Sequence, residues 1–479
     1  MHKPWRSITT AAGACVLSLT LGCTSILGNN QAREAKTEVP QSFGDLAAGG
    51  PSAATQQQWD QFFTDPDLRS LIEQALTNNQ ELNIRLQEII ITQNNVAALR
   101  GGYLPQVDAV VGGGVAKIPG ATAEGVNDEA HGVPNPLPDL HFGFVASWET
   151  DIWSVIRNAR KSAKFNYEAT IQGRNFLITE IVAEIARSYY ELVALDNQIE
   201  IVDRNVELQK NALEIVKLKK EAAHDTELGV QRFQAEVLKN QGRRYKLEQQ
   251  RILVESRINF LVGRFPQRVQ RNSQSFMSTP PAIVTTGLPA DLLQNRPDVK
   301  AAELRLEASK LDTRSAKARF YPSLRLDANV GYQSFNPTHL LDTPKSLAMN
   351  LAGNLVAPLL NRAAIKADYR SANARQIQAV FDYERTILQA FTDVYNQLNA
   401  ISNLRQRYEQ LSQQVAALKA AIEVSKLLYQ SAHADYNEVL MTTRDSLEAE
   451  MELVDAKKDQ MQAVVAIYQA LGGGWRQGA

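Results

Sequence analysis

The chain has 479 residues and a nearly balanced charge, with 51 basic and 52 acidic residues and a formal net charge of -1. It contains no basic run with interleaved aromatic residues, so nothing indicates nucleic acid as a partner. It also lacks a phosphate-binding Gly-x-x-x-x-Gly-Lys-Ser/Thr loop, a His-Glu-x-x-His helix, a paired Cys motif and a Gly-x-Ser-x-Gly elbow. We therefore expect no catalytic residue, no metal site and no enzymatic activity.

Residues 1–22 have the pattern of an export signal, with a positive start and an apolar stretch that ends at Leu-Gly-Cys. This looks like a bacterial lipoprotein signal, in which cleavage before Cys23 leaves a residue that is acylated on its thiol and amine. Thr20 stands where such signals usually carry Leu, so the alternative is an uncleaved anchor or an ordinary signal peptide. The absence of Asp at position 24 favours delivery to the outer membrane. The covalent lipid on Cys23 is the only attached group expected, and we predict no other cofactor.

Residues 24–58 are polar and predict an extended segment, and we expect residues 23–64 to form a lipidated N-terminal tether. Because Cys15 leaves with the signal, the mature chain keeps one Cys and no intrachain disulfide is expected. No later segment approaches about 18 consecutive apolar residues, so no transmembrane helix is expected. If the mature chain crosses a membrane, it must do so as β-strands in a closed barrel.

The helical and strand periods alternate in the first half. Asp65 is a predicted N-cap with Pro66 at the first helical position, and one helix is expected from there to Gly101. Two strands, separated by a loop at 119–138, then lead into a heptad seam from Ile178 to Val216, in which ten of twelve positions are apolar. If this helix is one of several that together line a tube, it needs contacts on both of its flanks. Residues beside the seam should then also be buried.

The order of elements recurs in the second half. Phe320-Tyr321-Pro322 answers Tyr103-Leu104-Pro105 at the helix-to-strand junction, and Ser431-Ala432-His433 answers Ala222-Ala223-His224 at the break between long helices. The sequence therefore predicts two internal structural repeats, at 65–263 and 297–475, with a Pro-rich linker at 264–296 and a tail at 476–479.

The predicted strands alternate apolar and polar residues. The third carries Leu324, Leu326 and Ala328 on one face and Arg325, Asp327 and Asn329 on the other. This alternation is typical of a lipid-facing wall around a watery lumen. Four strands cannot close a barrel, since about eight is the smallest number that does, so two or more chains must contribute. The alternative is a soluble pair of hairpins packed on a core.

Several segments resemble those of one family. Residues 287–299, Gly-Leu-Pro-Ala-Asp-Leu-Leu-Gln-Asn-Arg-Pro-Asp-Val, are close to a signature of the TolC-like outer-membrane efflux proteins. That signature belongs to the lipoprotein channels of resistance-nodulation-division (RND) efflux systems, the NodT group. The segments 63–68 and 470–475 and the lipid site at Cys23 match as well, so the likeness covers nearly the whole mature chain.

The resemblance implies an α+β membrane protein. In this fold, a homotrimeric β-barrel with four strands per chain is continuous with a long α-helical coiled-coil tunnel in the periplasm, and the linker 264–296 lies at the equatorial region. The resemblance also implies a lipid-anchored position in the outer membrane of a Gram-negative bacterium. The implied partners are a periplasmic adaptor (membrane fusion) protein and an inner-membrane RND pump driven by protons.

The resemblance further places a periplasmic gate at the two helix breaks, where the family uses acidic rings and polar links. Glu438 falls where TolC carries a gate aspartate, and Asp435 lies beside it. Met441 takes the place of a second gate aspartate, and Gly229 takes the equivalent acidic place in the first repeat. Glu438 and Asp435 are therefore the predicted gate residues. The alternative is that Glu438 is an ordinary solvated helix charge.

The leading function is a passive, gated outer-membrane exit channel of a tripartite RND-type efflux system, which expels small molecules such as drugs, toxic compounds or metal ions. Two alternatives stay open, namely an outer-membrane duct of a type I protein secretion system and a structural coiled-coil lipoprotein without a pore. The sequence does not identify the cargo.

Overall fold

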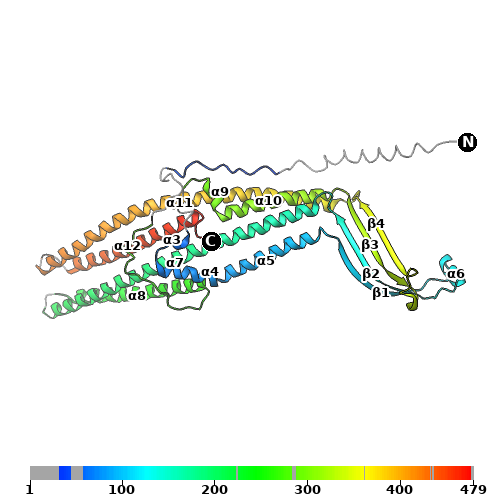
Figure 1. Cartoon of the computed structure of the whole chain (residues 1–479). Coiled ribbons are helices and arrows are strands. Elements are labelled where there is room, and N and C mark those ends of the chain that lie inside the picture. Colours follow the sequence, from blue (N-terminus) through cyan, green and yellow to red (C-terminus); the bar gives the residue numbers. More distant parts are fainter. Residues whose placement is uncertain are drawn as a thin grey trace. The chain divides into compact units, whose positions relative to one another are not determined.

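The computed structural model describes residues 32–44, 58–222, 225–282, 287–360, 362–431, 433 and 436–475. The predicted signal (1–22) and tail (476–479) lie outside these residues. The elements in chain order are α3 (Trp59–Phe62), α4 (Pro66–Asn78), α5 (Gln80–Gly101), β1 (Gln106–Ala116), α6 (Ala123–Ala130), β2 (Leu137–Thr150), α7 (Val155–Glu221), α8 (Glu227–Val262), α9 (Asp291–Asn295), α10 (Pro297–Ala318), β3 (Ser323–Ser334), η1 (Pro337–His339), β4 (Leu347–Val356), α11 (Ala363–Gln430) and α12 (Tyr436–Ala470) (Figure 1).

The chain divides into two compact units, and each takes segments from both halves of the sequence. The first, here called the sheet unit, contains Ile90–Glu168 and Leu304–Asp382 together with the described residues 32–35. The second, the helix unit, contains Lys36–Ile89, Ala169–Glu303 and the residues from Tyr383 onward. The order of helix, two strands, long helix and returning helix is the same in both halves. That this order reflects an internal duplication, and the predicted domain boundaries, stay predictions.

The strands of the sheet unit form one antiparallel sheet in the order β1-β2-β3-β4 (Figure 1). Its register brings the predicted apolar positions of all four strands onto one face, as in the row Ala109, Phe144, Val330 and Met349. The other face carries rows of polar residues such as Glu149, Arg325 and Asn354. The predicted alternation of the strands is therefore confirmed.

The apolar face of this sheet is exposed. Val111 and Leu351 are 87% and 80% exposed, and Phe144 and Met349 are also more than half exposed. Strands β1 and β4 form the edges of the sheet, and each is hydrogen-bonded to a single neighbouring strand within the described residues. Exposed apolar surface of this extent, bounded by open strand edges, is typical of surfaces that contact other proteins or a membrane.

The single helix predicted from Asp65 to Gly101 is wrong, because the chain breaks between α4 and α5. Asn79 lies at the break with extended backbone angles, φ -62° and ψ 126°. Its Oδ1 accepts a hydrogen bond from the Leu82 N–H at 3.0 Å, and its Nδ2 donates to the Leu261 carbonyl at 2.7 Å. Asn79 thus caps α5 and connects the break to α8 by a hydrogen bond. The apolar spacing continues across the break, so the spacing alone suggested a single helix.

Other helix ends follow their sequence signals. Asp65 caps α4, with its Oδ1 accepting hydrogen bonds from two backbone N–H groups at 2.9 and 3.2 Å, and Pro66 is the first helical residue. Gly263 ends α8 with a left-handed φ of 78°. The breaks between α7 and α8 and between α11 and α12 lie at the predicted places. The helix α6, inside the predicted loop at 119–138, is an element that the sequence did not indicate.

The core of the helix unit is built around α7. From Ile178 to Ile199, residues beside the heptad seam such as Val182, Tyr189 and Val193 are at most 2% exposed, and they share one apolar cluster with residues of α4, α8 and α12. The prediction of burial on both flanks is confirmed for this part of the seam.

Beyond Glu200 the burial narrows to one stripe. The seam residues Leu213 and Val216 pack with α8 and with Leu440 of α12, whereas Leu208 and Ile215 on the flank are about half exposed. The prediction fails here because fewer elements of the same chain surround the helix. Burial is also sparse along α11. Among the described residues, none of the helices is both long and apolar enough to cross a membrane.

Candidate functional site

The predicted lipid site, Cys23, and one predicted gate residue, Asp435, lie outside the described residues. The other gate residue, Glu438, is exposed in the first turn of α12. Its carbonyl oxygen accepts a hydrogen bond from the Thr442 hydroxyl at 2.8 Å. Its carboxylate forms no hydrogen bond or ion pair with any described residue. In the single chain, this carboxylate is therefore exposed to solvent at the end of the helical hairpin that α11 and α12 form.

The first hairpin carries a carboxylate that the sequence comparison of gate positions missed. Gly229 lies in the first turn of α8, and its N–H donates a hydrogen bond to Thr226 Oγ1 at 3.3 Å. A Cβ at Gly229 would lie only 2.7 Å from Asp225 Oδ1. The acidic group that is absent at position 229 is thus present four residues earlier. Met441, at the other departure from the family pattern, is about half exposed on α12.

Two polar contacts join the hairpin of α7 and α8 to the hairpin of α11 and α12 near their ends. The Lys219 Nζ lies 3.6 Å from the centre of the Tyr429 ring. The Arg232 Nη1 donates a hydrogen bond to Asn437 Oδ1 at 3.2 Å. The Arg232–Asn437 hydrogen bond is exposed and the Lys219–Tyr429 contact is only partly buried, so each is individually weak and can be exchanged for contacts with water. No group of three or more potential metal ligands occurs among the described residues.

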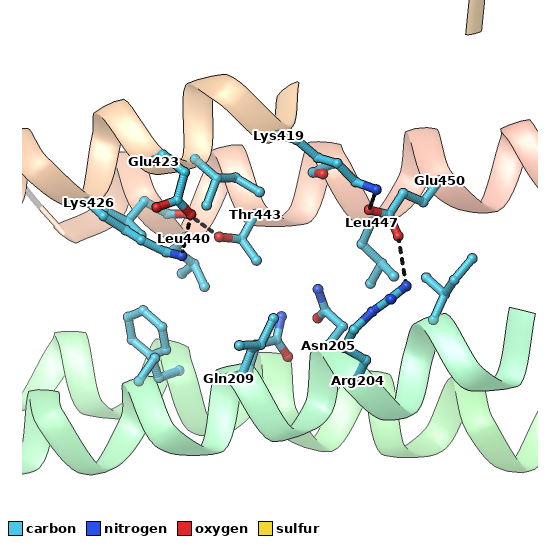
Figure 2. A pocket seen from close by; sticks show the side chains of 17 residues that line it. Arg204, Asn205, Gln209, Lys419, Glu423, Lys426, Leu440, Thr443, Leu447 and Glu450 are labelled. Atoms are coloured by element: carbon cyan, nitrogen blue, oxygen red, sulfur yellow. Dashed lines mark hydrogen bonds and ion pairs between the residues drawn. The ribbon is translucent and has the colours of Figure 1, made fainter. Parts of the chain in front are cut away.

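A pocket of about 460 Å³ lies between the two hairpins and is lined by α7, α8, α11 and α12 (Figure 2). Figure 2 shows Arg204 and Lys419 converging on Glu450, at 3.5 and 3.0 Å. Lys426 pairs with Glu423 at 2.9 Å on α11. The carboxylate of Glu450 thus links α7, α11 and α12 across the pocket.

The wall of the pocket contains two buried amide atoms that have no hydrogen-bond partner among the described residues. Gln209 is 2% exposed, and its Oε1 accepts a hydrogen bond from Asn240 Nδ2 at 2.9 Å. Its Nε2 and the Oδ1 of Asn205 have no partner among the described atoms. In protein interiors, ordered water commonly satisfies buried polar atoms that lack a protein partner. The sequence could have indicated these buried polar atoms. Gln209 and Ser188 are the two polar residues of the otherwise apolar heptad seam, and each carries a buried atom without a partner among the described residues.

Arg296, in the segment 287–299, is a buried cation with a structural role. Its Nε and Nη2 donate hydrogen bonds to the Asp298 carboxylate at 3.0 and 2.7 Å, and its Nη1 donates to Asp393 at 3.0 Å and to the Ala470 carbonyl at 3.2 Å. Burial alone would lower the pKa of Arg296, but the hydrogen bonds and charges of the two carboxylates outweigh burial and raise it. The guanidinium therefore stays charged and joins α10, α11 and α12.

The glycine-rich segment at 470–475 completes this joint. Gly472 has a left-handed φ of 82°, and a Cβ there would lie 2.6 Å from the Asn295 carbonyl oxygen. The two segments that carry most of the family resemblance are far apart in sequence but contact each other here. This contact gives both segments a structural role.

Known proteins resemble this chain over most of its length. The sequence profile of the outer membrane efflux protein family matches residues 71–264 and 288–473. The pyoverdine export outer membrane protein OpmQ of Pseudomonas aeruginosa is 29% identical over 444 residues, covering 91% of this chain and 92% of OpmQ. The cation efflux system protein CusC of Escherichia coli O6:H1 is 24% identical over 469 residues, covering 97% and 98%. A crystal structure of a membrane protein from Pseudomonas aeruginosa has the same fold, with a TM-score of 0.83, 23% identity and coverage of 93% and 98%.

Proposed function

Because the chain belongs to the outer membrane efflux protein family, we propose that it is the passive, gated exit channel of a tripartite RND-type efflux system. Membership confirms the predicted TolC-like resemblance and the absence of enzymatic activity, since the family consists of outer membrane efflux channels. The alternative of a structural coiled-coil lipoprotein without a pore does not fit this membership. The RND pump, the gate and the class of cargo are parts of the proposal.

The exposed apolar face of the sheet carries the proposal. A lipid bilayer would cover that face, and the polar face would then line a water-filled lumen. One chain supplies four strands with open edges at β1 and β4, and about eight strands are needed to close the smallest barrels. Three copies that pair edge to edge would close a barrel without leaving a free strand edge. The chain would thus act as a homotrimer.

Exposed apolar stripes on the helices support the same homotrimer. On α8, Leu238, Tyr245 and Ile252 recur every seven residues and are 59%, 68% and 51% exposed. On α11, Leu388 and Tyr395 repeat the spacing and also stay exposed. Heptad-spaced apolar residues form the contact seam of coiled coils. A neighbouring copy on each side would bury both stripes and continue a helical tunnel wall.

The ends of the two hairpins form the proposed periplasmic gate. Glu438 and Asp435 of the second hairpin, joined by Asp225 of the first, would bring carboxylates from three chains to one narrow mouth. Such a ring repels anions and attracts cations.

We expect Glu438→Ala to reduce cation selectivity, measured as the reversal potential under a KCl gradient in planar bilayers. Glu452→Ala, which removes an exposed carboxylate farther along α12, is the matched control. If Glu438→Ala leaves both the conductance and the reversal potential unchanged, Glu438 is not part of the gate.

We further propose that the channel sits in the outer membrane of a Gram-negative bacterium, anchored by lipid on Cys23. The described part of the tether supports a fixed path, because Phe43 is 2% exposed and stacks on Phe391 of α11 with ring centres 5.3 Å apart. A periplasmic adaptor and an RND pump would complete the system. The names of OpmQ and CusC refer to cargoes as different as pyoverdine and cations, which favours selection of cargo by the pump.

The test is to purify the full-length protein, cross-link it and record it in planar bilayers. The proposal predicts a trimer and discrete, pump-independent conductance steps, and a monomer without conductance would overturn it. Cross-linking in cells identifies the partner. Capture of a proton-driven pump with its adaptor supports the RND system, whereas capture of an ATP-driven exporter supports the type I secretion alternative.

A further inference from the structure

Basic residues gather where the helices of the sheet unit meet its strands. One ten-residue segment lies beside each of the four junctions, at 92–101, 155–164, 310–319 and 362–371. Together these segments contain twelve basic and two acidic residues, although the net charge of the chain is -1. Strands β1 and β3 begin, and β2 and β4 end, at these junctions, so all four lie at the same end of the antiparallel sheet (Figure 1). We call these four segments the basic belt.

The cations of the basic belt form stripes along their helices. On α7, Arg157, Arg160, Lys161 and Lys164 are all exposed and spaced so that they share one side of the helix. On α10, Arg314 and Lys317 are exposed in the same way.

Most of these charges lack an acidic partner. Four of the twelve cations pair with a carboxylate. The others, including Arg160, Lys161, Arg314 and Lys317, have no acidic partner among the residues that the structure describes. Like charges at helical spacing destabilise the helix that carries them. A bound anionic partner would remove this repulsion.

Aromatic residues lie between the basic belt and the exposed apolar face. The Trp153 indole stacks on Tyr321 with ring centres 4.8 Å apart, and its Nε1 donates a hydrogen bond to the Pro322 carbonyl at 2.8 Å. The Trp148 Nε1 donates to the Tyr103 carbonyl at 3.3 Å. Both indoles remain partly exposed. Tyr and Trp rings with an apolar body and a polar tip mark the interface between a bilayer and water.

We propose that the basic belt binds the anionic headgroups of the phospholipid leaflet next to the helices. The inference rests on the proposed function, in which the sheet crosses the outer membrane. The order of surfaces along the chain, from apolar face to aromatic residues to cations, then matches the order of acyl chains, interface and phosphates in a leaflet. Each Lys or Arg near an anionic lipid surface strengthens binding by about fivefold.

The test uses the purified full-length trimer in nanodiscs of phosphatidylcholine that contain a trace of spin-labelled phosphatidylglycerol or spin-labelled phosphatidylcholine. The belt variant carries Arg160→Gln, Lys161→Gln, Arg314→Gln and Lys317→Gln. The control variant removes four exposed cations of the helix unit that have no acidic partner among the described residues, through Arg69→Gln, Lys246→Gln, Arg268→Gln and Arg405→Gln. Electron paramagnetic resonance then measures how strongly each labelled lipid is immobilised at the protein surface.

The wild type and the control variant are expected to prefer phosphatidylglycerol by at least about threefold at low salt, and the preference should fall as salt screens the charges. The belt variant keeps eight of the twelve cations, so its preference should fall well below that of the wild type without vanishing. A belt variant that keeps the wild-type preference, or a wild type with no preference, overturns the inference. A second assay measures whether each protein sediments with purified peptidoglycan. If the wild type shows no lipid preference but sediments with peptidoglycan, and the belt variant does not sediment, the inference is overturned and the belt is assigned to the cell wall.

Conductance of the same preparations in phosphatidylcholine bilayers separates this inference from the proposed function. Channels that conduct but show no lipid preference overturn the basic belt alone. A protein that neither conducts nor forms trimers overturns the proposed function, together with the inference that rests on it.

Discussion

Removing the Arg296 guanidinium should loosen the joint between α10, α11 and the end of α12. Four hydrogen bonds of 2.7 to 3.2 Å connect this side chain to two carboxylates and a carbonyl. Loss of one partner from a buried ion pair costs about 3–5 kcal/mol. The Asp298 and Asp393 side chains are 20% and 33% exposed, so water can solvate part of the charge left behind. We therefore expect Arg296→Ala to lower the free energy of unfolding by about 2–4 kcal/mol.

Urea unfolding of the protein in detergent, followed by the circular dichroism of its helices, measures the effect. Arg296→Lys keeps the charge but not the two parallel hydrogen bonds to Asp298, so its loss should be about half that of the Ala variant. Arg69→Ala, which removes an exposed cation, is the control and should stay within about 0.5 kcal/mol of the wild type. If Arg296→Ala unfolds at the same urea concentration as the control, the buried joint does not contribute as argued.

Three further predictions concern other contacts. Tyr189→Phe removes a 2.8 Å hydrogen bond to the carboxylate that caps α4 and should cost about 1 kcal/mol in the same unfolding assay. Phe43→Ala should release the segment before it from α11, measured as faster cleavage there by trypsin. Hydrogen bonds from Gln231, and to a smaller extent from Lys220, lower the pKa of Glu227. The stabilisation that these bonds give to the helix end is therefore complete above the ordinary Glu pKa of about 4.3, and it is lost as the pH falls through the lowered pKa. In Glu227→Gln, hydrogen exchange at this helix end should lose that pH dependence.

Local patterns predicted much of this fold, and contacts between distant residues account for what they missed. The two faces of the sheet follow from a period of two, which each strand carries by itself. The break at Asn79 depends on the Leu261 carbonyl, which lies 182 residues away. The role of Arg296 likewise depends on Asp393 and Ala470, which are 97 and 174 residues distant.

The candidate gate was harder to predict than the fold. Family alignment compares single positions, and at Gly229 it found no acidic residue. The structure shows that the Asp225 carboxylate occupies the space where a Cβ of residue 229 would lie. A turn of the helix separates these two residues in sequence, but the tight break brings them together. Charge at a hairpin end therefore has to be compared by position in space.

The uneven burial of α7 follows from the same reasoning about the assembly. From Ile178 to Ile199, elements of one chain surround the helix, and its flanks are buried without any partner. Past Glu200 only a stripe is buried, while Leu208 and Ile215 stay exposed. A heptad seam specifies one contact, and a helix in a closed wall needs a second one on its other side. The proposed trimer would provide the second contact for this part of α7.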